Sequence, residues 1–296
     1  MKLSLLDLKE LCEIGKKAAL EAGMYIQSQF DKHYVKQEKT GGDSLASQVV
    51  TEVDFKAQAI ILSHLDQTIA PYDLGLLTEE SVDDQSRAVK DYFWCIDPMD
   101  GTLPFTEKRT GYAVSIALVS RQGNPVVAIV YIPDLNECYT AVKGLGVHLN
   151  DKPFTRALKQ KEHVFDVYWD ISFKSETYFE SVLKQLTLYA NKHNLKIKIH
   201  TDYGGVRNAI GVMQSKTSSY FKFSKKSNGC GSIWDYAATR LFFEELGLVV
   251  ANASGGVLNL NHPTTTFMNN SGVLYATDKD LSNYIVNIGV MLKQAN

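Results

Sequence analysis

Two aspartates three positions apart, Asp97 and Asp100, are the residues of this sequence that most clearly suggest chemistry. They end a short apolar run and are followed by Gly101 and Thr102. The apolar run predicts a buried strand, which Pro98 is expected to stop. Two close carboxylates repel each other by roughly 4 kcal/mol at 4 Å and an effective dielectric near 20. A cation is therefore expected between them, and oxygen ligands favour a hard ion such as Mg²⁺. The alternative is an ordinary strand end and turn.

A second predicted strand also ends in acidic residues. Residues 74–77 are apolar, and Thr78, Glu79 and Glu80 follow them. Two adjacent acids after a strand can form a plain solvated turn. In layered α/β sheets, however, ligands bind outside the carboxyl ends of strands. The two strand ends together favour one shared site.

Two further aspartates stand at the starts of predicted helices. Thr51 and Asp54 have the spacing of a capping box, ahead of a helix that begins near residue 51. Ser232 and Asp235 have the same spacing, ahead of a helix that Gly247 is expected to end. Each aspartate either caps its helix and does nothing else, or caps it and also points at a site. Both roles place the carboxylate at a helix N-terminus.

The elements that position these residues follow from periodicity and turn signals. Further helices are expected at 4–30, 176–190, 206–215 and 280–293. Further strands are expected at 112–120, 126–131, 138–142, 164–169, 195–199, 219–223, 249–251, 257–260 and 273–276. Short turns between the first three of these strands indicate an antiparallel meander. Polar residues 31–47 predict a loop, and residues 152–162 predict a boundary. The chain is thus divided into an N-terminal half, 1–155, and a C-terminal half, 156–296, which carries Asp235.

Composition limits the classes of function. The chain has 296 residues, of which 45% are hydrophobic and 22% charged, as in ordinary globular proteins. A net charge of −2 without a basic block argues against binding a nucleic-acid polymer, but it allows a small phosphorylated ligand. No stretch approaches the roughly 18 apolar residues of a membrane span, so no membrane partner is expected. The scattered cysteines predict free thiols in a reducing compartment, by default the cytoplasm.

Four motifs occur in one order along the chain, at residues 50–54, 78–81, 97–102 and 234–238. In this order and spacing they resemble the inositol monophosphatase family, whose members are metal-dependent, lithium-sensitive phosphomonoesterases. The resemblance extends from the first predicted helix to the last, and four motifs together are far more specific than any one. It implies an α/β layered sandwich, α-β-α-β-α, of the inositol monophosphatase and fructose-1,6-bisphosphatase type. It also implies a possible homodimer.

Within the family, residues 100–105 and 108–111 are more similar to 3′(2′),5′-bisphosphate nucleotidases, which convert 3′-phosphoadenosine 5′-phosphate to AMP and phosphate. Inositol monophosphatases usually carry Asn-Phe after Asp-Gly-Thr-x. Lys222 lies where the inositol enzymes tend to have an acid, and a cation there suits a second phosphate. The resemblance thus implies a bisphosphate nucleotidase, with inositol-1-monophosphatase or a sugar bisphosphatase as the alternatives.

The resemblance also implies the metal ligands. Glu79, Asp97 and the carbonyl of Met99 would hold one Mg²⁺. Asp97, Asp100 and Asp235 would hold a second, and Glu79 would hold a weaker third through waters. Shells rich in water and poor in carboxylates are tolerated by Mg²⁺, so two or three ions are expected.

The remaining implied roles concern the reaction. A metal-activated water attacks the phosphomonoester, and paired metals stabilise the entering and leaving oxygens. Asp54 and Thr102, with Glu79, are the candidates to orient this water or take its proton. The N–H groups of Gly101 and Thr102 face the phosphate, and Lys222 contacts the substrate.

Two other classes stay open. Haloacid-dehalogenase-like phosphatases use Asp-x-Asp-Gly-Thr after a strand, with the first aspartate attacking phosphorus. Here two residues separate Asp97 from Asp100, so the geometry differs. A non-catalytic metal- or ligand-binding regulatory protein could use the same scaffold. The presence of every acid that catalysis needs favours an enzyme.

Overall fold

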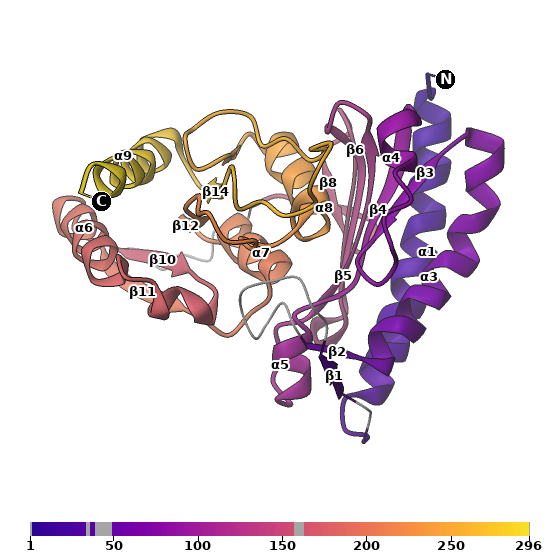
Figure 1. Ribbon diagram of the computed structural model, residues 1–296, viewed down its shortest axis with the longest axis horizontal. Coiled ribbons are helices and arrows are strands. Elements are labelled where there is room, and N and C mark those ends of the chain that lie inside the picture. The colour runs from indigo at the N-terminus through magenta and orange to yellow at the C-terminus, as the bar shows by residue number, and fades with distance from the viewer. Residues whose placement is uncertain (1, 34–35, 39–48, 157–162, 296) are drawn as a thin grey trace.

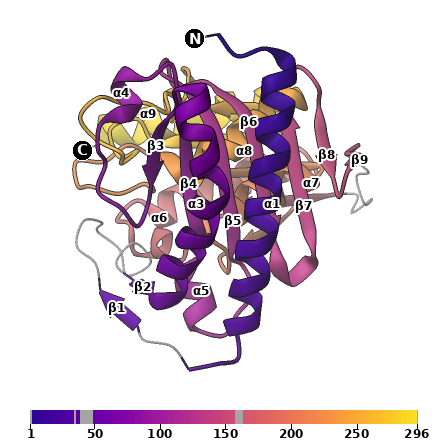
Figure 2. The same ribbon diagram turned by 90° about the vertical axis from the view of Figure 1, so that its right-hand side faces the viewer.

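The computed structural model describes residues 2–33, 36–38, 49–156 and 163–295, which form alternating layers of helix and sheet (Figure 1). Helices α1 (Leu5–Gln29) and α3 (Glu52–Tyr72) cover one face of a seven-stranded sheet (Figure 2). Helices α7 (Gly205–Gln214) and α8 (Ile233–Glu245) lie between it and a five-stranded sheet. Helices α6 (Phe179–Lys192) and α9 (Lys279–Ala295) cover the outer face of the second sheet. The predicted α-β-α-β-α sandwich is confirmed.

The larger sheet contains the strands of the N-terminal half. In spatial order these are β3 (Gly75–Thr78), β4 (Tyr92–Asp100), β5 (Ala113–Ser120), β6 (Pro125–Ile132), β7 (Glu137–Val142), β8 (Val147–Leu149) and β9 (Lys152–Pro153). Strands β3 and β4 are parallel and the other pairs antiparallel, so the predicted meander is confirmed. Helices cover both faces, and for this reason β5 and β6 are predominantly apolar and buried throughout.

Strand β4 continues past Pro98, so the prediction that this proline stops the strand is wrong. Asp97 pairs with Ser115 and Asp100 with Ala113, which leaves one extra residue on β4. This is a β-bulge, and a proline is tolerated there because the ladder is interrupted. A bulge bends a strand and redirects its side chains, which is how two acids of one strand reach the same site.

The smaller sheet belongs to the C-terminal half. Its strands, in spatial order, are β11 (Lys196–His200), β10 (Val164–Tyr168), β12 (Thr217–Lys222), β14 (Val273–Ala276) and β13 (Val249–Ala251). The strand predicted at 257–260 is absent from the described residues. Leu258 and Leu260 are buried between the layers, and the Leu258 carbonyl accepts a hydrogen bond from the side chain of Arg240. The alternating pattern was therefore produced by side-chain packing without a strand partner.

Three predicted helix starts are confirmed at their caps, whereas the helix predicted from 176 begins at Phe179. Ser4 and Asp7, Thr51 and Asp54, and Ser232 and Asp235 all form capping boxes. Most of the predicted loop 31–47, and residues 157–162 of the predicted boundary, lie outside the described residues. Strand β1 (Lys36–Glu38) lies within this predicted loop, so the prediction is wrong at these residues; the strand pairs with β2 (Val49–Thr51). The division of the chain into two halves stays a prediction. No described helix combines the length and apolar character that crossing a membrane requires.

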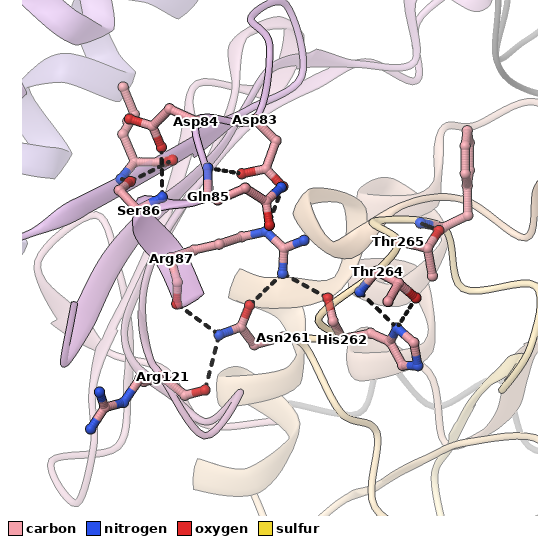
Figure 3. A network of polar contacts seen from close by, with 12 residues as sticks. Asp83, Asp84, Gln85, Ser86, Arg87, Arg121, Asn261, His262, Thr264 and Thr265 are labelled. Atoms are coloured by element: carbon pink, nitrogen blue, oxygen red, sulfur yellow. Dashed lines mark hydrogen bonds and ion pairs between the residues drawn. The ribbon is translucent and has the colours of Figure 1, made fainter. Parts of the chain in front are cut away.

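A buried arginine fastens the C-terminal half to the larger sheet (Figure 3). Arg87 of α4 (Ser86–Val89) is 1% exposed and binds Asp83 at 2.7 Å. It also donates to the Asn261 side chain at 2.6 Å and the His262 carbonyl at 2.7 Å. Asn261 in turn donates to the carbonyls of Arg87 and Arg121 at 3.0 and 2.9 Å. We refer to Asp83, Arg87, Asn261 and His262 as the Arg87 network.

Candidate active site

A cavity of about 270 Å³ opens where the carboxyl ends of β3 and β4 meet the C-terminal half. Eight of the predicted site residues line it: Glu79, Asp97, Met99, Asp100, Gly101, Thr102, Lys222 and Asp235. The ninth, Asp54, lies directly behind Thr102 and is hydrogen-bonded to it. The structure therefore brings all the predicted site residues together.

Three carboxylates form the centre of the site. Asp97, Asp100 and Asp235 each offer an oxygen, and these atoms lie within 4.8 Å of one another. Asp97 and Asp100 are buried and come from the bulged end of β4. Asp235 comes from the first turn of α8, which packs against this sheet. We refer to these three residues as the carboxylate cluster.

Glu79 is placed beside the cluster by the parallel pairing of β3 with β4. Thr78 pairs with Ile96, and the Glu79 N–H then donates to the Ile96 carbonyl at 3.1 Å. Glu79 and Asp97 thus leave adjacent strands at the same edge of the sheet. The negative charge of Glu79 contributes to raising the pKa values of Asp54, Asp97 and Asp235. The two strand ends thus meet at one place, as the sequence predicted for a shared site.

Like charges and burial together disfavour ionisation of the cluster. Burial raises the pKa of Asp97 well above its usual range, and the charges of Glu79, Asp100 and Asp235 raise it further. Burial and the charge of Asp235 likewise raise the pKa of Asp100. Burial and Glu79 raise the pKa of Asp235 to about 6, although the Lys222 ammonium lowers it. A cation between the oxygens would relieve this repulsion, and an all-oxygen donor set fits Mg²⁺.

The backbone around the cluster holds the carboxylates in place. Asp100 accepts hydrogen bonds from the N–H groups of Gly205 and Val206, both at 2.9 Å, at the start of α7. A Cβ atom at Gly204 would lie 2.4 Å from an oxygen of the same carboxylate, so a larger residue there would displace Asp100. Asp235 accepts from the Ser232 N–H at 2.9 Å. The capping role and the site role of Asp235 are therefore combined in one side chain.

Asp54 and Thr102 form a second hydrogen-bonded unit at the cavity wall. One oxygen of Asp54 accepts from the N–H and hydroxyl of Thr51 at 2.8 and 2.6 Å. The other lies 2.9 Å from the Thr102 hydroxyl, which is also 3.1 Å from the Met99 carbonyl. Burial raises the pKa of Asp54 to about 6; hydrogen bonds from Thr51 lower it and the Glu79 charge raises it. This unit can accept a proton near neutral pH.

Gly101 sets the direction of the chain as it leaves the bulge. Its φ of +88° lies in the left-handed region, and a Cβ there would lie 2.7 Å from the Gly111 carbonyl oxygen. Helix α5 (Thr102–Thr106) starts at the next residue, with Thr102 facing the cavity. The glycine thus allows the close turn that brings Thr102 back to Asp54.

Lys222, predicted to contact the substrate, lines the cavity at the end of β12. Its ammonium group is ion-paired with Asp170. The rings of Tyr220 and Tyr236 lie 5.9 and 5.8 Å from it. Burial lowers the pKa of Lys222, but Asp170 and its other neighbours raise it overall, so the side chain is cationic.

Several cavity residues were missed by sequence reasoning. They are Arg109, Asp170, Glu176, Tyr178, Tyr203, Lys225 and Phe267. A signal existed for Asp170, because it follows the strand at 164–168 just as Glu79 follows β3. The others lie on irregular segments whose approach to the cavity depends on the packing of the two sheets.

Comparison with known proteins gives concordant results. A sequence model described as the inositol monophosphatase family matches residues 7–288. Nus factor SuhB of Escherichia coli is 27% identical over 250 residues, covering 83% of this chain and 86% of that protein. Inositol monophosphatase 2 of Solanum lycopersicum is 26% identical over 255 residues, covering 86% and 91%. The solved structure of Thermotoga maritima IMPase TM1415 superposes with a TM-score of 0.73 at 19% identity, covering 96% and 98%.

Proposed function

The chain belongs to the inositol monophosphatase family of metal-dependent phosphomonoester hydrolases, and we propose that its substrate is a 3′(2′),5′-bisphosphate nucleotide. In this reaction 3′-phosphoadenosine 5′-phosphate and water give AMP and phosphate. The observation that carries the proposal is the aromatic lining of the cavity beside the carboxylate cluster. A cytoplasmic location and a homodimer are predictions from the sequence and its resemblance alone.

The aromatic lining suits a nucleobase. The residues that line the cavity and are half-buried include four aromatics, Tyr178, Tyr203, Trp234 and Phe267. Stacking of a base on an aromatic face contributes about 1–3 kcal/mol. An inositol ring carries hydroxyl groups all round and requires hydrogen-bonding partners instead. The lining therefore favours a nucleotide over a polyol phosphate.

The carboxylate cluster would hold the metal ions. We assign Asp97, Asp100 and Asp235 to one Mg²⁺, and Glu79, Asp97 and the Met99 carbonyl to another. When bound, such ions neutralise charge on the phosphate oxygens and make water a stronger nucleophile at neutral pH.

The side chains of this protein then orient the reacting groups and move the proton. The Thr102 hydroxyl faces the cavity and is held by Asp54 at 2.9 Å. We assign proton uptake to this unit: Thr102 Oγ1 takes the proton of the attacking water as its own proton moves to Asp54 Oδ1. The backbone N–H groups of Gly101 and Thr102 are assigned to the phosphate. Correct alignment of the water and phosphate supplies much of the acceleration.

Inositol 1-phosphate is the second candidate substrate. Two observations favour it: the tomato relative is named an inositol monophosphatase, and the charge of Lys222 is already neutralised by Asp170. A paired ammonium and carboxylate can donate to and accept from the hydroxyls of a polyol. This candidate shares the carboxylate cluster and differs only in what the remaining cavity binds.

Purified protein assayed with both substrates tests the proposal. With Mg²⁺, kcat/KM should be higher for 3′-phosphoadenosine 5′-phosphate than for inositol 1-phosphate. Chelation with EDTA should stop phosphate release, and Li⁺ should suppress it. A clear preference for inositol 1-phosphate would overturn the nucleotide assignment in favour of the second candidate.

A further inference from the structure

A buried glutamine of α3 binds the turn that carries Glu79. Gln58 is 7% exposed and lies one helical turn after Asp54, on the same face of α3. Asp54 supports Thr102, which comes after β4, and Gln58 contacts the residues on either side of Glu79, which comes after β3. We propose that Gln58 is a positioning residue for metal binding, which keeps Glu79 at the carboxylate cluster. This inference rests on the proposed assignment of Glu79 to a Mg²⁺ ion.

Gln58 uses both ends of its side-chain amide. The amide oxygen accepts hydrogen bonds from the Thr78 hydroxyl and, at 3.2 Å, from the Glu80 N–H. The amide nitrogen donates to the Ser81 hydroxyl at 2.9 Å. Because a backbone N–H can only donate, the contact with Glu80 fixes which end of the amide is the oxygen. Three contacts with three residues of one short segment define both the position and the orientation of that segment.

The backbone at Glu79 is held from two sides. On one side the Glu79 N–H donates to the Ile96 carbonyl of β4 at 3.1 Å. On the other side Gln58 binds the residue before Glu79 and the residue after it. The turn is thereby joined to a strand and to a helix, so the Glu79 side chain starts from a defined place. Gln58 does not line the cavity, and it can therefore act on the site only through the residues that it binds.

Support of this kind is needed because the carboxylates around Glu79 repel it. The charge of Glu79 contributes to raising the pKa values of three nearby aspartates, so the repulsion acts on Glu79 in return. The chain is open to solvent directly after the turn, where Val82 is 94% exposed. An unsupported turn would let the Glu79 carboxylate move outward into water. Gln58 opposes this movement, so the carboxylate is already in place when a cation binds.

A substitution of Gln58 needs a control that weakens the same helix elsewhere. Gln58→Leu removes all three contacts and leaves a side chain of similar size. Thr68→Val, further along α3, is the matched control. Thr68 is 1% exposed and accepts a hydrogen bond from Trp94 of β4 at 2.9 Å, so the control also removes a buried contact of α3. Both variants should be less stable than the wild type, but only Gln58→Leu should affect Glu79.

Mg²⁺ affinity is measured by titration calorimetry and from the rise in melting temperature that Mg²⁺ produces, and neither measurement requires substrate. Gln58→Leu should raise the Kd by about tenfold, a usual cost of losing a group that orients a metal ligand. Thr68→Val should leave the Kd unchanged. Gln58→Glu should recover most of the affinity, because a carboxylate oxygen accepts from the same hydroxyl and N–H. Thr78→Val keeps the shape of its side chain, removes one of the three contacts and should raise the Kd by about threefold.

Glu79→Gln tests whether the effect passes through Glu79. This change should itself weaken Mg²⁺ binding, and adding Gln58→Leu to it should weaken binding little further. Wild-type Kd values in both Gln58→Leu and Thr78→Val, or the full tenfold loss on adding Gln58→Leu to Glu79→Gln, would overturn the role of Gln58. An unchanged Kd in Glu79→Gln would instead show that Glu79 does not bind the ion. That result would overturn the metal assignment, and this inference with it.

Discussion

Arg87 and Asp97 are both 1% exposed. The groups around Arg87 stabilise its charge, whereas those around Asp97 carry the same charge as its carboxylate. Arg87 meets Asp83, a side-chain amide oxygen and a backbone carbonyl, all of which stabilise its positive charge. Asp97 meets other carboxylates, which raise its pKa. The Arg87 network therefore stabilises the fold by itself. The carboxylate cluster is stable in its ionised form only with a partner of opposite charge, and unresolved repulsion of this kind is characteristic of functional sites.

Asp97→Asn should have the largest effect on turnover. We expect kcat to fall by about 10³-fold or more, because electrostatic stabilisation of the transition state depends on this carboxylate. The metal-free protein should be at least as stable as the wild type, since a buried repulsion is removed. Phosphate release and thermal melting measure the two effects. Asp66→Asn, at an exposed position of α3, is the control. Substantial turnover by Asp97→Asn would contradict the ligand assignment.

Arg87→Met should reduce stability strongly and turnover little, which is the reverse of the effect expected for Asp97→Asn. Leaving Asp83 and Asn261 without their buried partner should lower the free energy of unfolding by about 3–5 kcal/mol. The kcat of the folded protein should stay close to that of the wild type, because Arg87 does not line the cavity. Urea denaturation and initial rates test this. Arg121→Met is the control, since Arg121 contributes its carbonyl to the network. A small loss of stability with a large loss of kcat would contradict the claim that Arg87 serves the fold and not the reaction.

Metal binding should also distinguish the carboxylate cluster from the Arg87 network. At a Mg²⁺ concentration of 100 times Kd, the free energy of unfolding should rise by about 2.7 kcal/mol. Arg87→Met should retain this increment, because its carboxylate cluster is intact. Asp100→Asn should lose most of it. Denaturation with Mg²⁺ and with EDTA gives the increment for each protein. An increment in Asp100→Asn equal to that of the wild type would show that the ion binds elsewhere.

The smallest expected effect is the pH dependence of stability, which depends on the raised pKa values of Asp54 and Asp235. Asp54 and Asp235 have pKa values of about 6 in the folded protein and about 3.9 when unfolded. Between these values the folded state binds more protons, so the stability of the metal-free protein should fall as pH rises from about 4 to about 6. Mg²⁺ binds the ionised carboxylates, so its affinity should rise over the same range. Melting temperatures with EDTA and with Mg²⁺ test both slopes. A metal-free stability that increases from pH 4 to 6 would contradict the raised pKa values.

Local sequence features predicted the elements that carry the site. Capping boxes located the starts of α3 and α8, and the acids after an apolar run located the carboxyl end of β3, whereas β4 extends past Pro98 to Asp100. These signals are reliable because caps and strand ends depend on interactions within a few residues. The same local reasoning failed at 257–260, where side chains alternate between core and solvent but the backbone has no strand partner.

The sequence by itself determined which residues can bind a cation, accept a proton and begin or end each element. The tertiary structure decided which of them meet: the bulge that turns Asp97 and Asp100 to one side, the approach of Asp235, and the pairing of Lys222 with Asp170. Such contacts join segments far apart along the chain, and no local pattern encodes them. They depend on how two sheets and the helices between them pack, so the pairing of Lys222 with Asp170 could be recognised only in the folded protein.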